Sequence, residues 1–257
     1  MTSEIKQRIE QIRRGEMPEG YNRVRDSIIP SDWKQYCLGE LGKNKNGLNF
    51  HREDKGIKIR ILGVGDFGNL SVLRDLNALS EISMRFMPDD ELLLKNGDIV
   101  SIDIGACYKG YHGDSAWSYK VGNVSLQIEN LLKDTEQSLY EGLKQIKPGN
   151  RIGDISASIE KYAHEHQLGV VKELVGHGVG TSVHEDPDVP NFGIAGTGPA
   201  LKEGMVLAVE PMLTLGSPEI VILDDDWTIE TKDYSPSAHF EHTVVVTDDG
   251  CKILTGV

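Results

Sequence analysis

The sequence predicts an α+β fold, in which two amphipathic helices lie beside mainly antiparallel strands. Two stretches, residues 125–146 and 152–166, place apolar residues at helical spacing. Short apolar runs bounded by turn residues lie before and after them, as expected for strands. With 257 residues the chain can bury a sizeable core without disulfides.

The two helices follow from their apolar faces. The first, "SLQIENLLKDTEQSLYEGLKQI", ends at the helix-stopping "KPG", and the second is "IGDISASIEKYAHEH". Their predicted buried faces are Ile128, Leu131, Leu132, Leu139, Leu143 and Ile146, and then Ile152, Ile155, Ile159 and Tyr162. A further short helix is expected in "SEIKQRIEQIRR" near the N-terminus, followed by loops and short strands over residues 19–56.

The strands are predicted from apolar runs and turn signals. "DIVSIDIGA" and "SAWSYKVG" flank the turn "CYKGY" and predict a hairpin. Later strands are expected in "GVVKELVG", "MVLAVEPMLTL" and "HFEHTVVVTDDG".

The composition excludes several classes of protein. Three cysteines without CxxC spacing argue against a disulfide framework or a zinc finger. We expect a cytoplasmic protein with no signal peptide and no membrane span, because "MTSEIKQRIEQIRRGE" lacks an apolar core and no long apolar run follows. Residues 1–60 hold 13 Lys/Arg and 9 Asp/Glu, whereas the remainder holds 14 and 31, so the acidic body makes nucleic acid an unfavoured partner.

A pair of carboxylates lies on the predicted hairpin. With the turn at residues 108–110, Asp103 would stand opposite Asp114, on the same face of the hairpin. Two ionised carboxylates held that close repel unless a cation lies between them. Taken alone, the pair is more often two solvated acids beside a turn.

Three further segments favour a metal site. "VGHGVGTSVHEDP" places His177 between glycines and His184 seven residues on. Glu210 ends an apolar run before Pro211, and Glu241 begins another. A glutamate in such apolar surroundings is costly to bury unpaired. Each alone could be a carboxylate at a strand edge that faces water, but together they predict a shared site.

Two Asp, two Glu and one His suit divalent transition ions such as Mn, Fe(II), Co or Zn. Two ions about 3.5–4 Å apart can share carboxylates, lower the pKa of a water and polarise a carbonyl. The chemistry expected from this set of ligands is amide hydrolysis.

From about residue 88 to 257 the sequence closely resembles the type I methionine aminopeptidases. The matching segments are "LLLKNGDIVSIDIGACYKGYHGDSA", "GHGVGTSVHEDPDVPNFG", "MVLAVEPM" and "DDDWTIETKDYSPSAHFEHTVVVTDDGCKIL". The resemblance implies a pita-bread metallopeptidase fold, two divalent metal ions and a nascent-protein N-terminus as substrate. We expect a monomer.

The resemblance also implies a role for each matching residue. The metal ligands would be Asp103, Asp114, His177, Glu210 and Glu241, with Asp114 and Glu241 bridging both ions. Glu210 would handle the proton of the attacking water. His184 would hydrogen-bond the substrate peptide group, and Trp227 would lie near the substrate. His112, His239 and His242 are interpreted as ordinary strand positions or as residues that support the ligands.

The first part of the chain departs from that family. Arg85 stands where the family carries a histidine that assists substrate binding. Residues 1–98 instead resemble the start of a type I restriction enzyme specificity (S) subunit, in "EIKQRIEQIRRGEMPEGY", "SIIPSDW", "IRILGVGDFGNLSVL" and "LSEISMRFMPDDELLLKNGDIV". We therefore predict a divergent or replaced segment 1–87 and a peptidase domain 88–257.

Three alternatives stay open at this point. The chain could be a DNA-binding specificity module fused to a peptidase fragment, which salt-sensitive DNA affinity would reveal. It could resemble the Xaa-Pro aminopeptidases, which share the fold and the order of ligands. It could also be an inactive remnant that still binds metal.

Overall fold

The structure of this chain is a computed structural model that describes residues 94–224 and 228–255, together with four short N-terminal strands. The chain divides into two compact units, Met1–Asn96 and Gly97–Val257. In the first unit, β1 (Tyr21–Val24) pairs antiparallel with β2 (Ser27–Pro30), and β3 (Ile57–Ile61) pairs antiparallel with β4 (Ser80–Met84). The helix expected near residues 3–14 and the domain boundary expected at residue 87 lie outside the described residues.

The second unit confirms the α+β prediction. Its helices are α3 (Leu126–Leu143) and α4 (Ile152–Glu165), and both lie where the apolar periodicity places them. The Ser125 hydroxyl caps α3 by accepting from the Ile128 N–H at 3.3 Å. The Asp154 carboxylate supports the start of α4 by accepting from the Arg151 N–H at 2.7 Å.

Ten shorter strands and one long hairpin complete this unit. The hairpin is β5 (Ile99–Tyr108) with β6 (Tyr111–Lys120). The shorter strands are β7 (Gly169–Val170), β8 (Gly176–Gly178), β9 (Glu185–Val189), β10 (Val206–Val209), β11 (Met212–Thr214), β12 (Ile220–Ile222), β13 (Ile229–Thr231), β14 (Ser237–His239), β15 (His242–Val246) and β16 (Cys251–Ile253).

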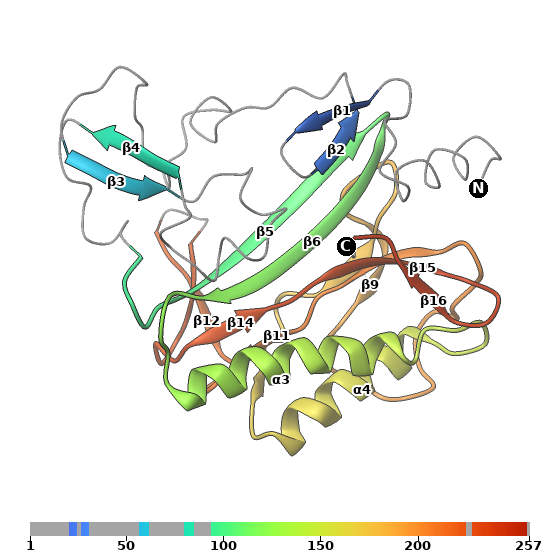
Figure 1. Cartoon of the computed structure of the whole chain (residues 1–257). Coiled ribbons are helices and arrows are strands. Elements are labelled where there is room, and N and C mark those ends of the chain that lie inside the picture. Colours follow the sequence, from blue (N-terminus) through green and yellow to red (C-terminus); the bar gives the residue numbers. More distant parts are fainter. Residues whose placement is uncertain are drawn as a thin grey trace. The chain divides into compact units, whose positions relative to one another are not determined.

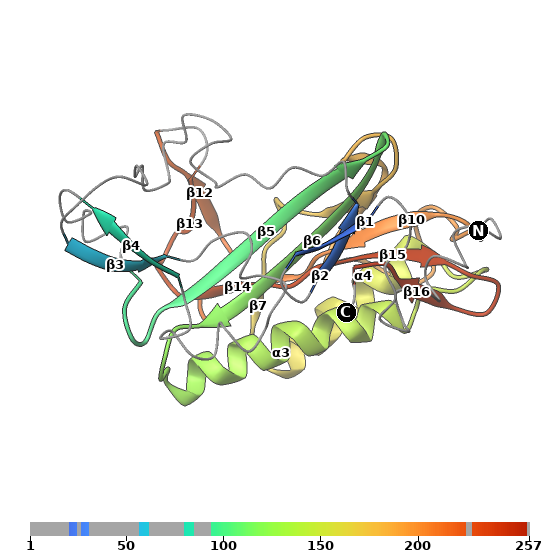
Figure 2. The ribbon, with the colours of Figure 1, turned by 45° about the horizontal axis from the view of Figure 1, so that its top comes forward.

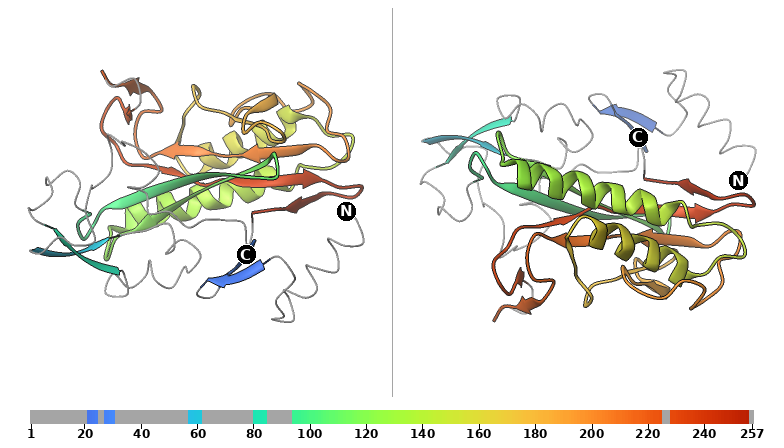
Figure 3. Two further views of the ribbon diagram at one scale, coloured as in Figure 1. Left: turned by 90° about the horizontal axis from the view of Figure 1, so that it is seen from above. Right: turned by 90° about the horizontal axis from the view of Figure 1, so that it is seen from below.

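Two antiparallel sheets hold most of these strands. The strand orders are β16-β15-β10-β8-β9 and β14-β11-β7. Seen from below, the helices lie side by side across the strands, and the β5–β6 hairpin lies on the opposite side from the helices (Figures 1 and 3). Figure 2 shows β5 and β6 lying side by side as two long strands.

All three of the later predicted strands are interrupted, and "HFEHTVVVTDDG" is broken at Phe240-Glu241, between β14 and β15. "GVVKELVG" forms β7 and β8 with a break between them, and "MVLAVEPMLTL" forms β10 and β11 with a break at Glu210-Pro211. Proline has no N–H for a ladder, which accounts for the break at Glu210-Pro211. Val209 pairs with His242 and Met212 pairs with His239, so the register does not slip across the gap. Glu210 therefore stands opposite Glu241 where the chain passes from one sheet to the other.

The core forms between the helices and the sheets. It contains most of the predicted helix faces, including Leu131, Leu139, Leu143, Ile146, Ile152, Ile155 and Ile159, while Ile128, Leu132 and Tyr162 are half-buried. Strand residues such as Leu207, Val209, Leu213 and Val244 complete it. Neither described helix is long and apolar enough to cross a lipid bilayer.

We predict that Leu139→Ala lowers the free energy of unfolding by about 2–5 kcal/mol, because the side chain is 0% exposed and its loss leaves a cavity. The measurement is urea-induced unfolding followed by circular dichroism. The matched control is Leu126→Ala in the same helix, where the side chain is 70% exposed and a change within about 0.5 kcal/mol is expected. Equal losses for the two variants would contradict the assigned packing face.

Candidate metal centre

The β5–β6 hairpin pairs Asp103 and Asp114 differently from the prediction but keeps both side chains on the same face. The turn is two residues long, with Lys109 at φ 52° and Gly110 at φ 81°, as a type I′ turn requires. Asp114 consequently pairs with Gly105, and Asp103 pairs with Ala116, so the two aspartates are not directly opposed as predicted. The shift is two residues, which leaves both side chains on the same face.

Hydroxyl groups join this hairpin to the strands that carry Glu241. The Thr243 hydroxyl accepts from the Asp114 N–H at 2.8 Å and donates to the Asp114 carbonyl at 2.7 Å. The Glu241 N–H donates to the Ala116 carbonyl at 2.8 Å. The Ser115 hydroxyl donates to the Glu241 carbonyl at 3.2 Å. These bonds fix the backbone of Asp114 against that of Glu241.

The break between β10 and β11 holds Glu210 in place. Its carbonyl accepts a hydrogen bond from the fully buried Asn191 side chain, at 3.0 Å from Nδ2. Sequence reasoning did not single out Asn191, because a lone asparagine in "DPDVPNFG" carries no signal of its own.

His177 lies in β8 where only glycine neighbours fit. A Cβ at Gly176 would collide with the Ala208 carbonyl, and one at Gly178 would collide with the Asp186 carbonyl. The two glycines therefore allow close packing of β8 against the neighbouring backbone. The imidazole Nε2 lies 3.4 Å from Glu210 Oε1 and 3.9 Å from Asp114 Oδ2.

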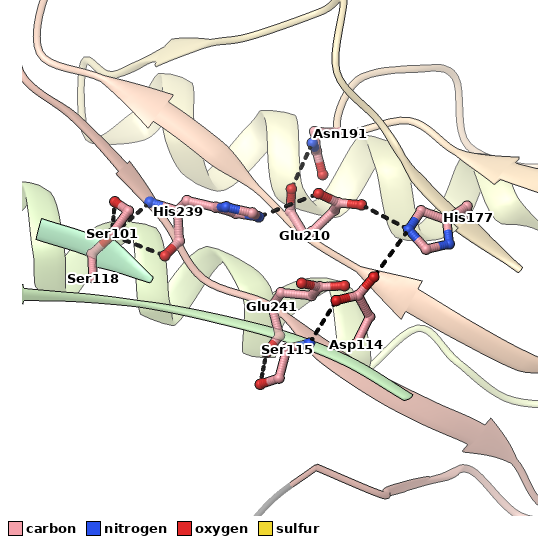
Figure 4. Close-up of polar contacts among 9 residues, drawn as sticks. All are labelled: Ser101, Asp114, Ser115, Ser118, His177, Asn191, Glu210, His239 and Glu241. Carbon is pink, nitrogen blue, oxygen red and sulfur yellow. Dashed lines mark hydrogen bonds and ion pairs between the residues drawn. The ribbon is translucent and has the colours of Figure 1, made fainter. Parts of the chain in front are cut away.

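The predicted ligand residues converge in space, and Figure 4 shows four of them, Asp114, His177, Glu210 and Glu241. Their ligand atoms form overlapping groups, each with all atoms within 4.8 Å of one another, and the groups include Asp103–Asp114–Glu241, His177–Glu210–Glu241 and Asp114–His177–His184. Asp103 is exposed, whereas the other four are buried, with Glu241 only 1% exposed.

The electrostatics of these carboxylates fit a cation. Burial, reinforced by Glu210, Asp114 and Asp103, raises the pKa of Glu241 from 4.5 to about 10. Although Asp103 is exposed as a whole residue, partial desolvation of its carboxylate raises its pKa, with nearby His239 opposing the shift and Asp114 and Glu210 adding to it. Glu241 Oε1 is buried without a hydrogen-bond partner. An unpartnered oxygen among repelling carboxylates is a suitable ligand for a divalent ion.

His184 lies beside this cluster on an exposed loop. Its ring centroid is 4.2 Å from that of His177 in an edge-to-face arrangement. The loop is fixed at its end by Glu185, whose carboxylate accepts from the Ser182 N–H at 2.7 Å and from the Thr181 hydroxyl at 3.0 Å. The same two donors hold the pKa of Glu185 below its ordinary value.

The three histidines interpreted as ordinary or supporting residues, His112, His239 and His242, have different surroundings in the structure. His112 donates its backbone N–H to Gly180, at 2.8 Å, so the hairpin is bonded to the loop that carries His184. His242 packs against Trp117 and hydrogen-bonds Thr255 at 3.0 Å, as an ordinary buried strand residue does. His239 lies 3.2 Å from Glu210, which fits the interpretation of His239 as a residue that supports a predicted ligand, although the sequence did not indicate which one. Trp227 and Arg85 lie outside the described residues.

Comparison with known proteins agrees with this geometry. The family model for "Metallopeptidase family M24" matches residues 78–248. The chain belongs to this family. It is 54% identical over 165 residues to methionine aminopeptidase 1 of Bacillus subtilis, covering 64% of this chain and 66% of that protein. It is 49% identical over 162 residues to the methionine aminopeptidase of Clostridium perfringens, covering 63% and 65%.

Solved M24 structures confirm the pita-bread fold. The methionine aminopeptidase of Thermotoga maritima is 42% identical with a TM-score of 0.64, over 69% of this chain and 70% of that one. That of Rickettsia prowazekii is 42% identical with a TM-score of 0.63, over 63% and 66%. A prolidase from Pyrococcus furiosus, at 24% identity and a TM-score of 0.51 over 64% and 43%, shares the fold alone.

The match is limited to part of each relative. The chain spans about two thirds of the length of the first two curated relatives, 66% and 65%. The predicted resemblance of residues 1–98 to a restriction specificity subunit stays a prediction, because most of those residues lie outside the described part of the chain.

We predict that Thr243→Val destabilises the metal-free protein by about 1–3 kcal/mol, because it leaves the buried N–H and carbonyl of Asp114 without partners. Urea unfolding measures the change, and Thr243→Ser, which keeps the hydroxyl, should recover most of it. Thr135→Val is the matched control, since that hydroxyl is equally buried but donates only to a helix carbonyl, that of Leu131. A loss in Thr135→Val as large as in Thr243→Val would contradict a special role for Thr243.

We also predict that the metal-free protein loses stability as the pH rises from the ordinary pKa of Glu241, 4.5, towards about 10. Over this range folded Glu241 keeps a proton that the unfolded chain releases, so unfolding releases a proton and is favoured by higher pH. The measurement is urea unfolding in chelator at about pH 5.5 and about pH 8.5. Glu241→Gln should show a smaller decrease than the unchanged protein, and an identical pH dependence would contradict the assignment.

Proposed function

We propose that this chain is a metal-dependent aminopeptidase that removes methionine from the N-terminus of nascent proteins. The observation that carries the proposal is the convergence of Asp103, Asp114, His177, Glu210 and Glu241 on one small region. The identity to proteins named methionine aminopeptidase supports the choice of substrate.

Two adjacent divalent ions fit the overlapping ligand groups. Glu241 belongs to one group with Asp103 and Asp114 and to another with His177 and Glu210. A carboxylate that belongs to two neighbouring groups can bridge two ions, and Asp114 is in the same position. Mn, Fe, Co or Zn would suit these oxygen and imidazole ligands, and ions bound there would supply a Lewis acid for the scissile carbonyl and for water.

Side chains of this protein would carry out proton transfer and substrate binding. Glu210 would take the proton of the attacking water on its carboxylate and return it to the leaving amine. His184 would hydrogen-bond the substrate peptide group, since its ring lies beside His177 on the exposed loop. Trp227 would line the substrate site, as the resemblance implies. A cytoplasmic, monomeric enzyme remains our prediction.

The test is peptide cleavage by the full chain loaded with Co(II) or Mn(II). We expect release of methionine from Met-Ala-Ser, and we expect Glu210→Gln to lower kcat by about 10²–10⁴-fold because the amide cannot accept the water proton. Glu219→Gln is the matched control, since that carboxylate is exposed and pairs only with Lys232 in the described structure. Released methionine would be quantified by chromatography.

Other results would select the competing functions. Metal binding without cleavage of Met-Ala-Ser would indicate an inactive remnant. Preferential cleavage before proline, in a peptide such as Ala-Pro-Ser, would indicate an Xaa-Pro aminopeptidase. Either result would contradict the proposal.

A further inference from the structure

The Glu210 carboxylate lies between two imidazoles, one at each oxygen. His177 Nε2 is 3.4 Å from Oε1, and His239 Nε2 is 3.2 Å from Oε2 (Figure 4). All three side chains are largely buried, with exposures of 8% for His177, 15% for His239 and 11% for Glu210. His177 is one of the predicted ligands, whereas His239 was interpreted only as an ordinary strand residue or a residue that supports the ligands.

The positions of the hydrogens give these two histidines opposite roles. His177 Nδ1 is 2.9 Å from the Gly178 carbonyl, which can only accept, so Nδ1 carries the hydrogen. In the neutral ring Nε2 then has a free lone pair, as a metal ligand needs. His239 Nε2 faces a carboxylate oxygen, which accepts when ionised, so this nitrogen is suited to donate.

The backbone of His239 is held by the hydroxyl group of Ser118, which makes three hydrogen bonds. The His239 N–H donates to Ser118 Oγ at 2.8 Å, and Ser118 Oγ donates to the His239 carbonyl at 2.9 Å. Ser101 Oγ lies 2.6 Å from Ser118 Oγ and must donate to it, because the single hydrogen of Ser118 is already used. Ser118 thus makes one donated and two accepted bonds, and β14 also pairs with β11 at His239–Met212.

The imidazole nitrogen itself is a buried donor in need of an acceptor. His239 Nε2 is buried and makes no aligned hydrogen bond, although Glu210 Oε2 is within ion-pair distance. Hydrogen bonds at catalytic groups are often poorly aligned in ligand-free sites and tighten when the site is loaded. Glu210 Oε2, at 3.2 Å, lies at hydrogen-bonding distance as an acceptor for this nitrogen.

We propose that His239 is a positioning residue, whose Nε2–H holds Glu210 Oε2 and thereby directs Oε1 towards the side of His177 and the ligand cluster. The proposal rests on the function proposed above, in which Glu210 binds metal and handles the proton. It depends on the position of a hydrogen and not on a change of charge, because Nε2 carries its hydrogen in both the neutral donor tautomer and the protonated ring.

The sharpest test replaces His239 with glutamine or asparagine, whose amide side chains differ in length by one methylene group. In His239→Gln the side-chain nitrogen reaches the place of Nε2, whereas in His239→Asn it reaches only the place of Nδ1. We expect His239→Gln to stay within about 3-fold of the unchanged protein, and His239→Asn and His239→Leu to lose about 10–100-fold in kcat or in Co(II) affinity. KM for Met-Ala-Ser should change less than kcat, since His239 contacts Glu210 rather than substrate.

A second measurement does not depend on activity. Titration with Co(II) gives the number of ions bound and their visible absorption, which responds to the orientation of a ligand carboxylate. We expect the spectrum to change in His239→Asn and His239→Leu and to be retained in His239→Gln. The control is His242→Gln, which removes an equally strand-bound, buried imidazole that packs on Trp117 instead of Glu210 and should leave the spectrum unchanged.

The outcomes separate this inference from the proposed function. If the unchanged protein binds Co(II) but cleaves no peptide, the function is wrong and the Co(II) data still decide the role of His239. Equal spectra, affinities and kcat for the Gln, Asn and Leu variants would overturn the positioning role. Loss of one equivalent of Co(II) in His239→Gln would also overturn it, in favour of direct ligation by the imidazole. Thermal unfolding of each metal-free variant identifies any that fail to fold.

Discussion

The repulsion among four neighbouring carboxylates is the constraint on which the architecture of residues 97–255 depends. Asp103, Asp114, Glu210 and Glu241 come from three separate parts of the chain and meet around His177. Buried carboxylates that lie close together move apart unless the backbone holds them in place. They take up protons unless a cation neutralises their charge. The fold has to supply the backbone restraint before any ion can bind.

Two devices provide that restraint. The first is a ladder that keeps its register across an interruption, which sets Glu210 opposite Glu241 although neither residue is in a strand. The second is a row of hydroxyl bonds, from Thr243 and Ser118, that substitutes for regular pairing between β6 and the 239–243 segment. Side-chain hydroxyls can satisfy both polar groups of a facing residue, so these contacts hold β6 of the hairpin against the 239–243 segment, and Asp103 is carried by the paired strand β5.

Sequence reasoning could reach the elements and the ligand residues, but not the contacts that orient them. The helices α3 and α4 follow from apolar spacing, and the clustering of the five predicted ligand residues follows from acids and a histidine placed next to apolar runs. The pairing of Asp103 was wrong by two residues because the prediction centred the turn between residues 108 and 109. The observed turn is centred one residue later, between Lys109 and Gly110, and that moves every partner by two positions. Asn191, Ser118 and Thr243 bond to residues 19, 121 and 129 positions away in the sequence, so no local pattern marks them.

The contact made by His239 also could not be predicted from the sequence. In sequence it is one of two histidines flanking Phe240-Glu241, and the two are indistinguishable by composition. In space His239 faces Glu210, while His242 packs on Trp117. Only the pleat and the break at Glu241 decide which imidazole faces the carboxylates, since neighbouring strand positions alternate between faces.

The buried carboxylates also connect metal binding with folding. Glu241 is 1% exposed and its pKa is about 10, so the metal-free fold keeps it as a neutral acid at the expense of a proton that water would otherwise take. A divalent ion that binds only the folded form replaces this proton and stabilises the fold by mass action. The buried carboxylates that make the metal-free protein less stable at higher pH would therefore make the metal-bound protein more stable. In this arrangement a divalent ion would take the place of the proton on Glu241, and the hydroxyl contacts of Thr243 and Ser118 would keep the carboxylates together before it binds.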